Sequence, residues 1–277
     1  MSADPIIRLV GVSKRFGRQQ VLANVSLDVF PHQTLALIGE SGCGKSVTLK
    51  LIVGLLTPTE GEVFFEGKPV HRMTERELTE MRLRVGFLFQ GAALFDSLTV
   101  FDNVAFGLRA KGGVAEAEVR RRVRERLQEV GLPPSAEAKM PAELSGGMRK
   151  RVGLARALAL DPDVMLYDEP TTGLDPIMSD VINELILRTR ARRPVTSLVV
   201  THEMRTVRKV ADRVVMIHPV GRLAPREPQV LYDGPPDGLA TCGDARVRQF
   251  VEGEARERIS ELQAEFTESG ERGASAP

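Results

Sequence analysis

The chain has 277 residues, of which 42% are hydrophobic and 27% are charged, a composition typical of a globular protein with a sizeable core. Its 38 basic and 37 acidic residues nearly cancel, so the overall charge gives no support to nucleic-acid binding.

The sequence contains no apolar run near the roughly 20 residues that span a bilayer, and its first residues lack a signal-peptide pattern. We therefore expect the chain to stay in the cytoplasm, where any membrane role requires a partner. The two cysteines, Cys43 and Cys242, predict free thiols and neither a disulfide framework nor a metal site.

The first part of the chain predicts a strand, a glycine loop and a helix in that order. Residues 6–38 alternate as strands do, and the apolar run Leu35–Ile38 predicts a buried strand of a parallel or mixed sheet. The run ends in the glycine-rich sequence GESGCGKS. A helical pattern follows, with Leu49, Ile52 and Val53 on one face.

The glycine loop fits the phosphate-binding pattern G-x-x-x-x-G-K-[ST] completely. Backbone N–H groups of such a loop turn inward around phosphate oxygens, and the following helix N-terminus adds its positive dipole. The alternative, a strand-to-helix turn without a ligand, is disfavoured by the flanking strand and helix. The residues predicted to bind phosphate are Gly39, Glu40, Ser41, Gly42, Cys43, Gly44, Lys45 and Ser46, with Lys45 on the β- and γ-phosphates and the Ser46 hydroxyl on Mg²⁺.

After Gln90 the pattern becomes helical and rich in arginine and glutamate. Val119, Val123, Leu127 and Val130 fall on one face of a helix. We interpret residues from about 91 to 160 as a helical subdomain inserted into the sheet domain.

Within that stretch, the sequence Leu144-Ser145-Gly146-Gly147-Met148 precedes a helix. Ser145 is a plausible N-cap, and the two glycines allow close approach of another group to the backbone. A second anion site is one interpretation. A simple capped helix is the other, and it is preferred for this segment alone.

Two further buried strands are predicted, and both end in polar residues. Val164–Tyr167 ends at Asp168 and Glu169, and Ser197–Val200 ends before His202, with a helix over about 178–192 between them. The alternation predicts a parallel α/β sheet, whose ligands bind at the carboxyl ends of the strands, so these clusters can converge with the loop.

The Asp-Glu pair suggests phosphate chemistry when it shares a sheet with a phosphate-binding loop. Asp168 is expected to hold Mg²⁺ through water, and Glu169 to polarise the attacking water as a general base. The alternative is a polar strand end, which the loop on the same sheet makes less favourable.

The C-terminal part is less regular. Five prolines over residues 219–238 predict extended loops and turns. Val251, Ala255, Ile259, Leu262 and Phe266 then fall on one helical stripe, and the last residues are expected to be disordered.

Together these motifs, in this order, resemble the nucleotide-binding subunits of ABC transporters over about residues 6–220. The resemblance implies an α/β P-loop NTPase fold, a mixed sheet with helices and an inserted helical subdomain. It also implies ATP and Mg²⁺ as ligands. It places the ATPase domain at about 6–252 and a C-terminal extension at 253–277.

The resemblance also assigns roles to individual residues. Gln90 matches the glutamine that senses Mg²⁺ and the γ-phosphate, and His202 matches the switch histidine. Phe16 stands where the family usually has a tyrosine that stacks on adenine, and its aromatic face should preserve stacking. The residues matched to contacts across the dimer are Ser145, Gly146, Gly147 and Asp175.

These roles imply a head-to-tail homodimer with two ATP molecules between the subunits. In each site one subunit supplies the phosphate loop and the other supplies the LSGG segment. Hydrolysis assisted by Glu169 then separates the two subunits.

Two single residues and two longer stretches resemble the ATPases of MCE/Mla-type lipid transporters in particular. They are Met148, Gly173, residues 88–109 and residues 245–253. The resemblance implies phospholipid transport between membranes, with an MlaE-like permease and an MCE-domain protein as partners. The subunit would lie peripherally on the cytoplasmic face of the inner membrane, and its C-terminal extension would either embrace the partner subunit or pack on its own domain.

Three alternatives remain open at this point. An ATPase for import of amino acids or other small solutes would share every catalytic residue. A soluble ABC ATPase acting on DNA or ribosomes is disfavoured by the charge balance and by the lack of a second ATPase core. A non-hydrolysing regulator is disfavoured because Glu169, Gln90 and His202 are all present.

Overall fold

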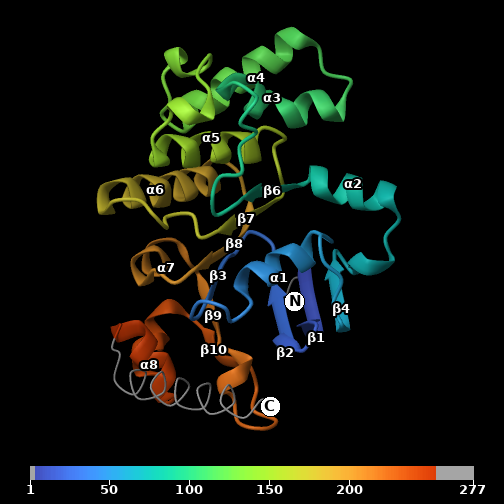
Figure 1. Cartoon of the computed structure of the whole chain (residues 1–277), viewed down its shortest axis with the longest axis vertical. Helices are drawn as coiled ribbons and strands as arrows, with labels where there is room; N and C mark the ends of the chain where they lie inside the picture. Colours follow the sequence, from blue (N-terminus) through green and yellow to red (C-terminus); the bar gives the residue numbers. More distant parts are fainter. Residues whose placement is uncertain (1–3, 254–277) are drawn as a thin grey trace, which may run out of the picture.

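The structure, a computed structural model, describes residues 4–253. It comprises a four-stranded sheet, a six-stranded sheet and a group of helices beyond one edge of the larger sheet (Figure 1). The strands are β1 (Ile7–Phe16), β2 (Gln19–Val29), β3 (Thr34–Ile38), β4 (Glu60–Phe65), β5 (Lys68–Pro69), β6 (Val85–Leu88), β7 (Val164–Asp168), β8 (Thr196–Thr201), β9 (Arg213–Ile217) and β10 (Val230–Gly234). The α-helices are α1 (Lys45–Ile52), α2 (Glu75–Leu83), α3 (Val100–Lys111), α4 (Glu116–Glu129), α5 (Gly146–Leu158), α6 (Pro176–Arg192), α7 (Met204–Val210) and α8 (Ala245–Glu252).

The four-stranded sheet is antiparallel, in the order β2-β1-β4-β5. Alternate residues of its strands, such as Ile7 and Leu9 on β1 and Leu27 and Val29 on β2, are buried in one apolar cluster. Because strand side chains point alternately to the two faces, this period of two puts one face of the sheet on the core.

The six-stranded sheet has the order β10-β9-β3-β8-β7-β6 and is parallel except for the β9–β10 pair. Every residue of β3, β7 and β8 is buried. Continuous apolar runs are typical of strands covered on both faces. The predicted mixed α/β sheet is therefore confirmed, and each of its three predicted buried strands is present, one or two residues longer.

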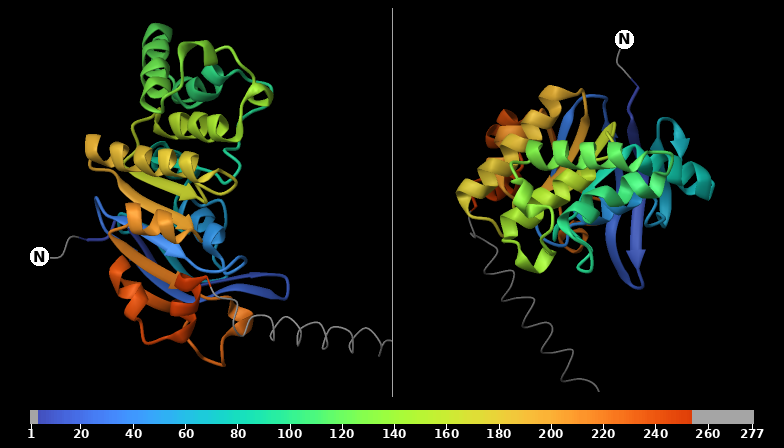
Figure 2. Two further views of the ribbon diagram at one scale, coloured as in Figure 1. Left: turned by 90° about the vertical axis from the view of Figure 1, so that its left-hand side faces the viewer. Right: turned by 90° about the horizontal axis from the view of Figure 1, so that it is seen from above.

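Helices α3, α4 and α5 form the helical part of the molecule and lie beyond α6 and β6 (Figures 1 and 2). The stripe Val119, Val123, Leu127 and Val130 is buried in the apolar cluster that joins these helices to the sheet. Asn103, also buried, donates and accepts hydrogen bonds with the backbone of Phe95, and so fixes the loop before α3.

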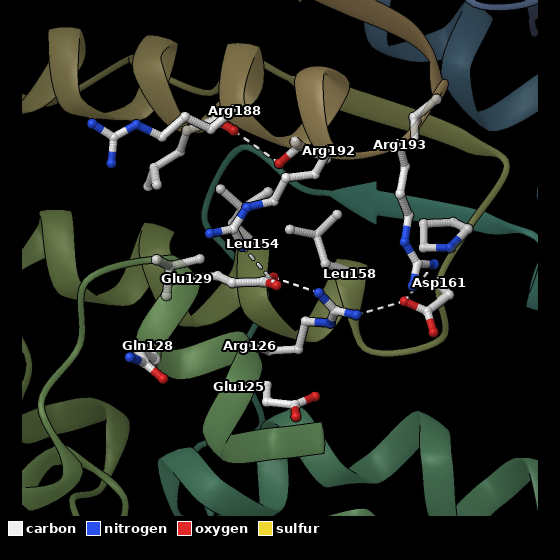
Figure 3. Close-up of a pocket in the computed structure, with 15 residues that line it drawn as sticks. Glu125, Arg126, Gln128, Glu129, Leu154, Leu158, Asp161, Arg188, Arg192 and Arg193 are labelled. Carbon is white, nitrogen blue, oxygen red and sulfur yellow. Dashed lines mark hydrogen bonds and ion pairs between the residues drawn. The ribbon is translucent and has the colours of Figure 1, made fainter. Parts of the chain in front are cut away.

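A groove of about 550 Å³ separates α4 and α5 from α6 and is crossed by ion pairs (Figure 3). Arg126 of α4 lies 2.6 Å from Asp161, which Arg193 also approaches to 2.7 Å, and Glu129 lies 2.8 Å from Arg192 of α6. Surface ion pairs contribute little individually, but these partly buried pairs link the helical part to the sheet layer. The groove contains none of the predicted ATP-site residues.

The proline-rich stretch 219–238 was expected to form extended loops and turns, and the structure adds a strand to it. Val230–Gly234 form β10, which pairs antiparallel with β9 at the edge of the larger sheet. From residue 254 onward, the expected apolar stripe and the C-terminal extension lie outside the described residues. No helix in residues 4–253 is both long and apolar enough to cross a membrane.

Two residues of α3 provide a matched test of this packing. Leu108 is fully buried in the helical cluster, whereas Phe106 is 48% exposed. We expect Leu108→Ala to lower the free energy of unfolding by about 2–5 kcal/mol because it leaves a cavity. Phe106→Ala should cost at most about 1 kcal/mol. Denaturant unfolding measures both, and equal losses would contradict the assigned core.

Candidate active site

The predicted polar clusters meet at one edge of the larger sheet. In the parallel register Ile38 of β3 pairs with Thr201 of β8, and Asp168 of β7 pairs with Val200. The phosphate-loop sequence, Glu169 and His202 therefore leave the sheet from neighbouring strand ends. This convergence follows from the rule that carboxyl ends of parallel strands share an edge.

Glycine is required at two points of the loop. Gly39 has φ +147°, and a Cβ there would lie 2.1 Å from the backbone oxygen of Ile217. Gly44, with φ +106°, precedes α1, and a Cβ there would meet Leu22 at 2.5 Å. No L side chain fits either place without rearrangement, so the loop keeps its tight path between β3 and α1.

The loop lysine and serine are both held in place by their surroundings. Lys45 is buried, and its Nζ donates to the backbone oxygens of Gly39 at 2.8 Å and Glu40 at 3.0 Å. The Ser46 hydroxyl donates to Asp168 Oδ1 at 2.7 Å, and burial raises the pKa of Asp168. A hydroxyl and a carboxylate side by side are hard oxygen donors of the kind that Mg²⁺ takes alongside phosphate oxygens, so these residues fit that ion.

Glu169 is surrounded by polar groups from several segments. Its Oε2 lies 2.8 Å from His202 Nδ1 and accepts a hydrogen bond of 3.0 Å from Thr172, while its Oε1 lies 3.8 Å from Lys45 Nζ. The residue has φ +49°, a conformation unusual for a side chain larger than glycine. Its carboxylate is 9% exposed and faces the same cavity as the lysine.

A cavity of about 650 Å³ contains most of the predicted phosphate-site residues, a size suited to a small-molecule ligand. Its lining consists of Gln19, Val21, Glu40, Ser41, Gly42, Gly44, Lys45, Ser46, Val47, Gln90, Glu169, His202 and Phe250. The structure thus brings together the loop, Gln90, Glu169 and His202. Sequence analysis did not identify Phe250, Gln19 or Val21.

Phe16 does not line this cavity. It ends β1, is 45% exposed, and lies with Lys14 Nζ 5.2 Å from its ring centroid. Its predicted stacking on adenine therefore stays a prediction.

A second group of predicted residues lies together elsewhere on the chain. Ser145 caps α5 by accepting from Met148 N at 3.3 Å, and Asp175 caps α6 by accepting from two backbone N–H groups at 3.0 Å. The two helix starts adjoin, because a Cβ on Gly147 would lie 2.9 Å from the side chain of Met178. None of the four residues predicted to act across a dimer lines the cavity of its own chain.

Three residues that sequence analysis missed hold the backbone or a side chain of site residues in place. Lys150 of α5 is buried and donates to the backbone oxygen of Glu169 at 2.8 Å, and burial lowers its pKa. Gln229 is 1% exposed and donates to the backbone oxygens of Val21 and Cys43, each at 3.0 Å. Arg222 pairs with Glu40 of the loop at 2.7 Å. No local sequence pattern predicts the contacts of these three residues.

Comparison with known proteins agrees with this geometry. The family described as "ABC transporter" matches residues 22–172. The chain is 42% identical over 247 residues to the probable ribonucleotide transport ATP-binding protein mkl of Mycobacterium leprae, covering 89% of this chain and 69% of that protein. It is 41% identical over 250 residues to the intermembrane phospholipid transport system ATP-binding protein MlaF of Haemophilus influenzae, covering 90% and 91%.

The chain is also similar to a solved structure of an ATP-binding protein. The fold matches the dimeric, post-hydrolysis structure of the ATP-binding cassette MJ0796 bound to ADP and Pi. The TM-score is 0.72 and the identity 32%, over 77% of this chain and 96% of that one.

The chain therefore belongs to the ABC transporter family, and it is the ATP-binding, ATP-hydrolysing subunit of such a transporter. A subunit of this kind works with a membrane permease. The resemblance seen in the motifs is confirmed, and with it the ATPase fold.

The loop cysteine offers a test of the site's packing. Cys43 is fully buried, and burial raises the pKa of its thiol, although nearby Lys45 opposes the shift. Cys242 is only partly buried. Because thiolate is the reactive form, we expect a thiol reagent to label Cys43 at least about tenfold more slowly than Cys242 in folded protein. Mass spectrometry of the labelled peptides measures this, and the difference should vanish in denaturant. Equal rates in the folded protein would show that the loop is open.

Proposed function

We propose that this chain energises phospholipid transport as the ATPase of an Mla-type system. The observation that carries the proposal is its similarity to the phospholipid-transport ATPase MlaF over nearly the whole length of both chains. In this proposal residues 6–252 are the ATPase domain, residues 91–160 its helical subdomain, and residues 253–277 an extension. The partners are an MlaE-like permease and an MCE-domain protein, at the cytoplasmic face of the inner membrane.

The loop residues would bind the triphosphate of ATP. Backbone N–H groups of residues 39–46 and the N-terminus of α1 offer donors and positive potential to anionic oxygens. Lys45 Nζ, held by two loop carbonyls, would share its remaining donor with the β- and γ-phosphates. Ser46, Asp168 and Gln90 would hold Mg²⁺, which when bound neutralises and orients the phosphate oxygens.

Glu169 would act as the general base. A carboxylate with one oxygen held by His202 and Thr172 has its other oxygen, Oε1, toward Lys45 and the cavity. Oε1 would accept a proton from water as the water oxygen bonds to the γ-phosphorus and the bond to the bridging oxygen breaks. Lys150, which holds the backbone of Glu169, would position the carboxylate and take no part in the transfer.

A second copy of the chain would complete each site. Ser145 and Gly146 at the start of α5 are exposed and adjoin the start of α6, where Ile177 is 77% exposed. An exposed helix N-terminus suits an anion, and a large exposed apolar side chain beside it suits a protein contact. Both features support the head-to-tail dimer, with the LSGG segment of one chain facing the loop of the other.

The permease would dock on the helical part. Phe95 and Phe106 are both exposed, and their ring centroids lie 4.6 Å apart. Arg156 lies 5.8 Å from the centroid of the Phe95 ring. Paired aromatic side chains with a nearby arginine are typical of interface centres.

A second candidate is transport of a small polar solute. It is favoured by the mycobacterial relative, whose name assigns it to ribonucleotide transport. This candidate shares the ATPase mechanism and differs in the permease and cargo.

The hydrolytic step has a direct test. We expect Glu169→Gln to lower ATP turnover at least about a hundredfold while ATP binding persists, because the general base is lost and the loop is intact. The variant should accumulate as an ATP-bound dimer in size-exclusion chromatography. Lys45→Ala should lose ATP binding instead. Glu184→Gln, at a half-buried position on α6 that pairs with Lys209 outside the cavity, should behave as wild type. Normal turnover by Glu169→Gln would remove Glu169 from its role.

The cargo and partners have a separate test. Affinity purification of the tagged chain from its native membrane, followed by mass spectrometry, should recover an MlaE-like permease, an MCE-domain protein and phospholipid. Phe106→Ala should lower permease recovery about fivefold or more, whereas Val10→Ala, at an equally exposed site on β1, should not. Recovery of a different permease with a solute-binding protein would favour the second candidate.

A further inference from the structure

The residues at the active-site cavity fall into two sets. Lys45, the Ser46–Asp168 pair and the Glu169–His202 pair form the phosphate set, because each is suited to phosphate oxygens, Mg²⁺ or the attacking water. ATP is longer than its triphosphate. Its nucleoside therefore needs contacts beyond the phosphate set, and the remaining lining includes Gln19 and Val21 of β2 and Phe250 of α8.

Phe250 is the one phenylalanine, tyrosine or tryptophan in the described lining of this cavity. It is half-buried and packs against an apolar cluster that joins α8 to β3, α7 and β9. Val247, one turn earlier on α8, is fully buried in that cluster. Asp244 caps the helix by accepting from Arg246 N at 2.9 Å, and Arg246 also pairs with Glu227 at 2.6 Å. These contacts hold helix α8, which carries the ring, in place without a ligand.

The C-terminal segment, defined as residues 218–253 after β9, is also tied to the phosphate loop. Gln229 joins the backbone oxygens of Cys43 and Val21 to that of His218, with each hydrogen bond 3.0 Å long. Its side-chain oxygen accepts from Ala23 N at 2.9 Å. Since loop, β2 and C-terminal segment share this one buried amide, a ring carried by α8 has a defined place relative to the loop.

We propose that Phe250 contacts the base or ribose of the bound nucleotide, so that the C-terminal helix supplies a wall of the ATP site. The inference rests on the proposed binding of ATP in this cavity. A flat apolar ring suits a nucleobase, and such a contact tolerates different bases because each presents a π-face. It would act in addition to Phe16, which lies outside the cavity lining.

The test compares ligands that share a diphosphate and differ in the nucleoside. ADP and inorganic pyrophosphate are titrated calorimetrically, each with Mg²⁺, into the full chain and its variants. Phe250→Leu, which keeps an apolar side chain against the apolar cluster around Val247, should raise the Kd for ADP roughly tenfold and leave that for pyrophosphate unchanged. Phe250→Tyr should retain ADP affinity. Val251→Ala, beside it on α8 and outside the lining, should alter neither ligand.

The possible outcomes separate the two proposals. An unchanged ADP affinity in Phe250→Leu would overturn the contact and leave Phe250 as a packing residue. An equal loss for ADP and pyrophosphate would overturn it as well, because the variant would then have disturbed the loop. Lys45→Ala should weaken both ligands, and if it weakens neither, ATP binding in this cavity is itself wrong.

Discussion

The parallel pairing of β3, β8 and β7 is the constraint on which the active site depends. It brings the ends of three strands that are far apart in the sequence to one edge of one sheet. The pairing is stable because all three strands are buried on both faces, and a slip of register would place polar strand ends in the core. The strand pairing therefore suffices to make the phosphate loop, the carboxylates and the histidine neighbours.

The strained backbone at Glu169 shows how the surroundings hold the carboxylate. A left-handed conformation in a residue other than glycine costs about 1–3 kcal/mol and persists only when neighbours determine it. Lys150 holds the backbone oxygen of Glu169, and Thr172 and His202 hold its side chain. These contacts come from α5, from the loop before α6 and from the end of β8, so the position of the carboxylate depends on the packing of these segments as well as on β7.

The sequence predicted the site where its signal is local. The glycine loop, the strand-end carboxylates and the capped start of α5 each depend on a few consecutive residues, and all are found as expected. Gln229 could not be predicted, because its partner Val21 is 208 positions away and a lone glutamine among prolines carries no pattern. Because of the same prolines, β10 was not predicted. It is an edge strand, and its proline-flanked residues pair on one side only.

Helix α5 connects the two groups of functional residues within one chain. Its first turn is capped by Ser145, and both Ser145 and Gly146 are exposed there, where a second subunit is proposed to bind. Less than two turns later, Lys150 on the same helix holds the backbone of Glu169 in the chain's own cavity. An α-helix is rigid over this length, so a displacement of the α5 N-terminus moves the support of Glu169 with it. In the proposed dimer, contact with a second subunit and the placement of the Glu169 carboxylate are therefore mechanically linked, so that dimer closure would act on the carboxylate through α5.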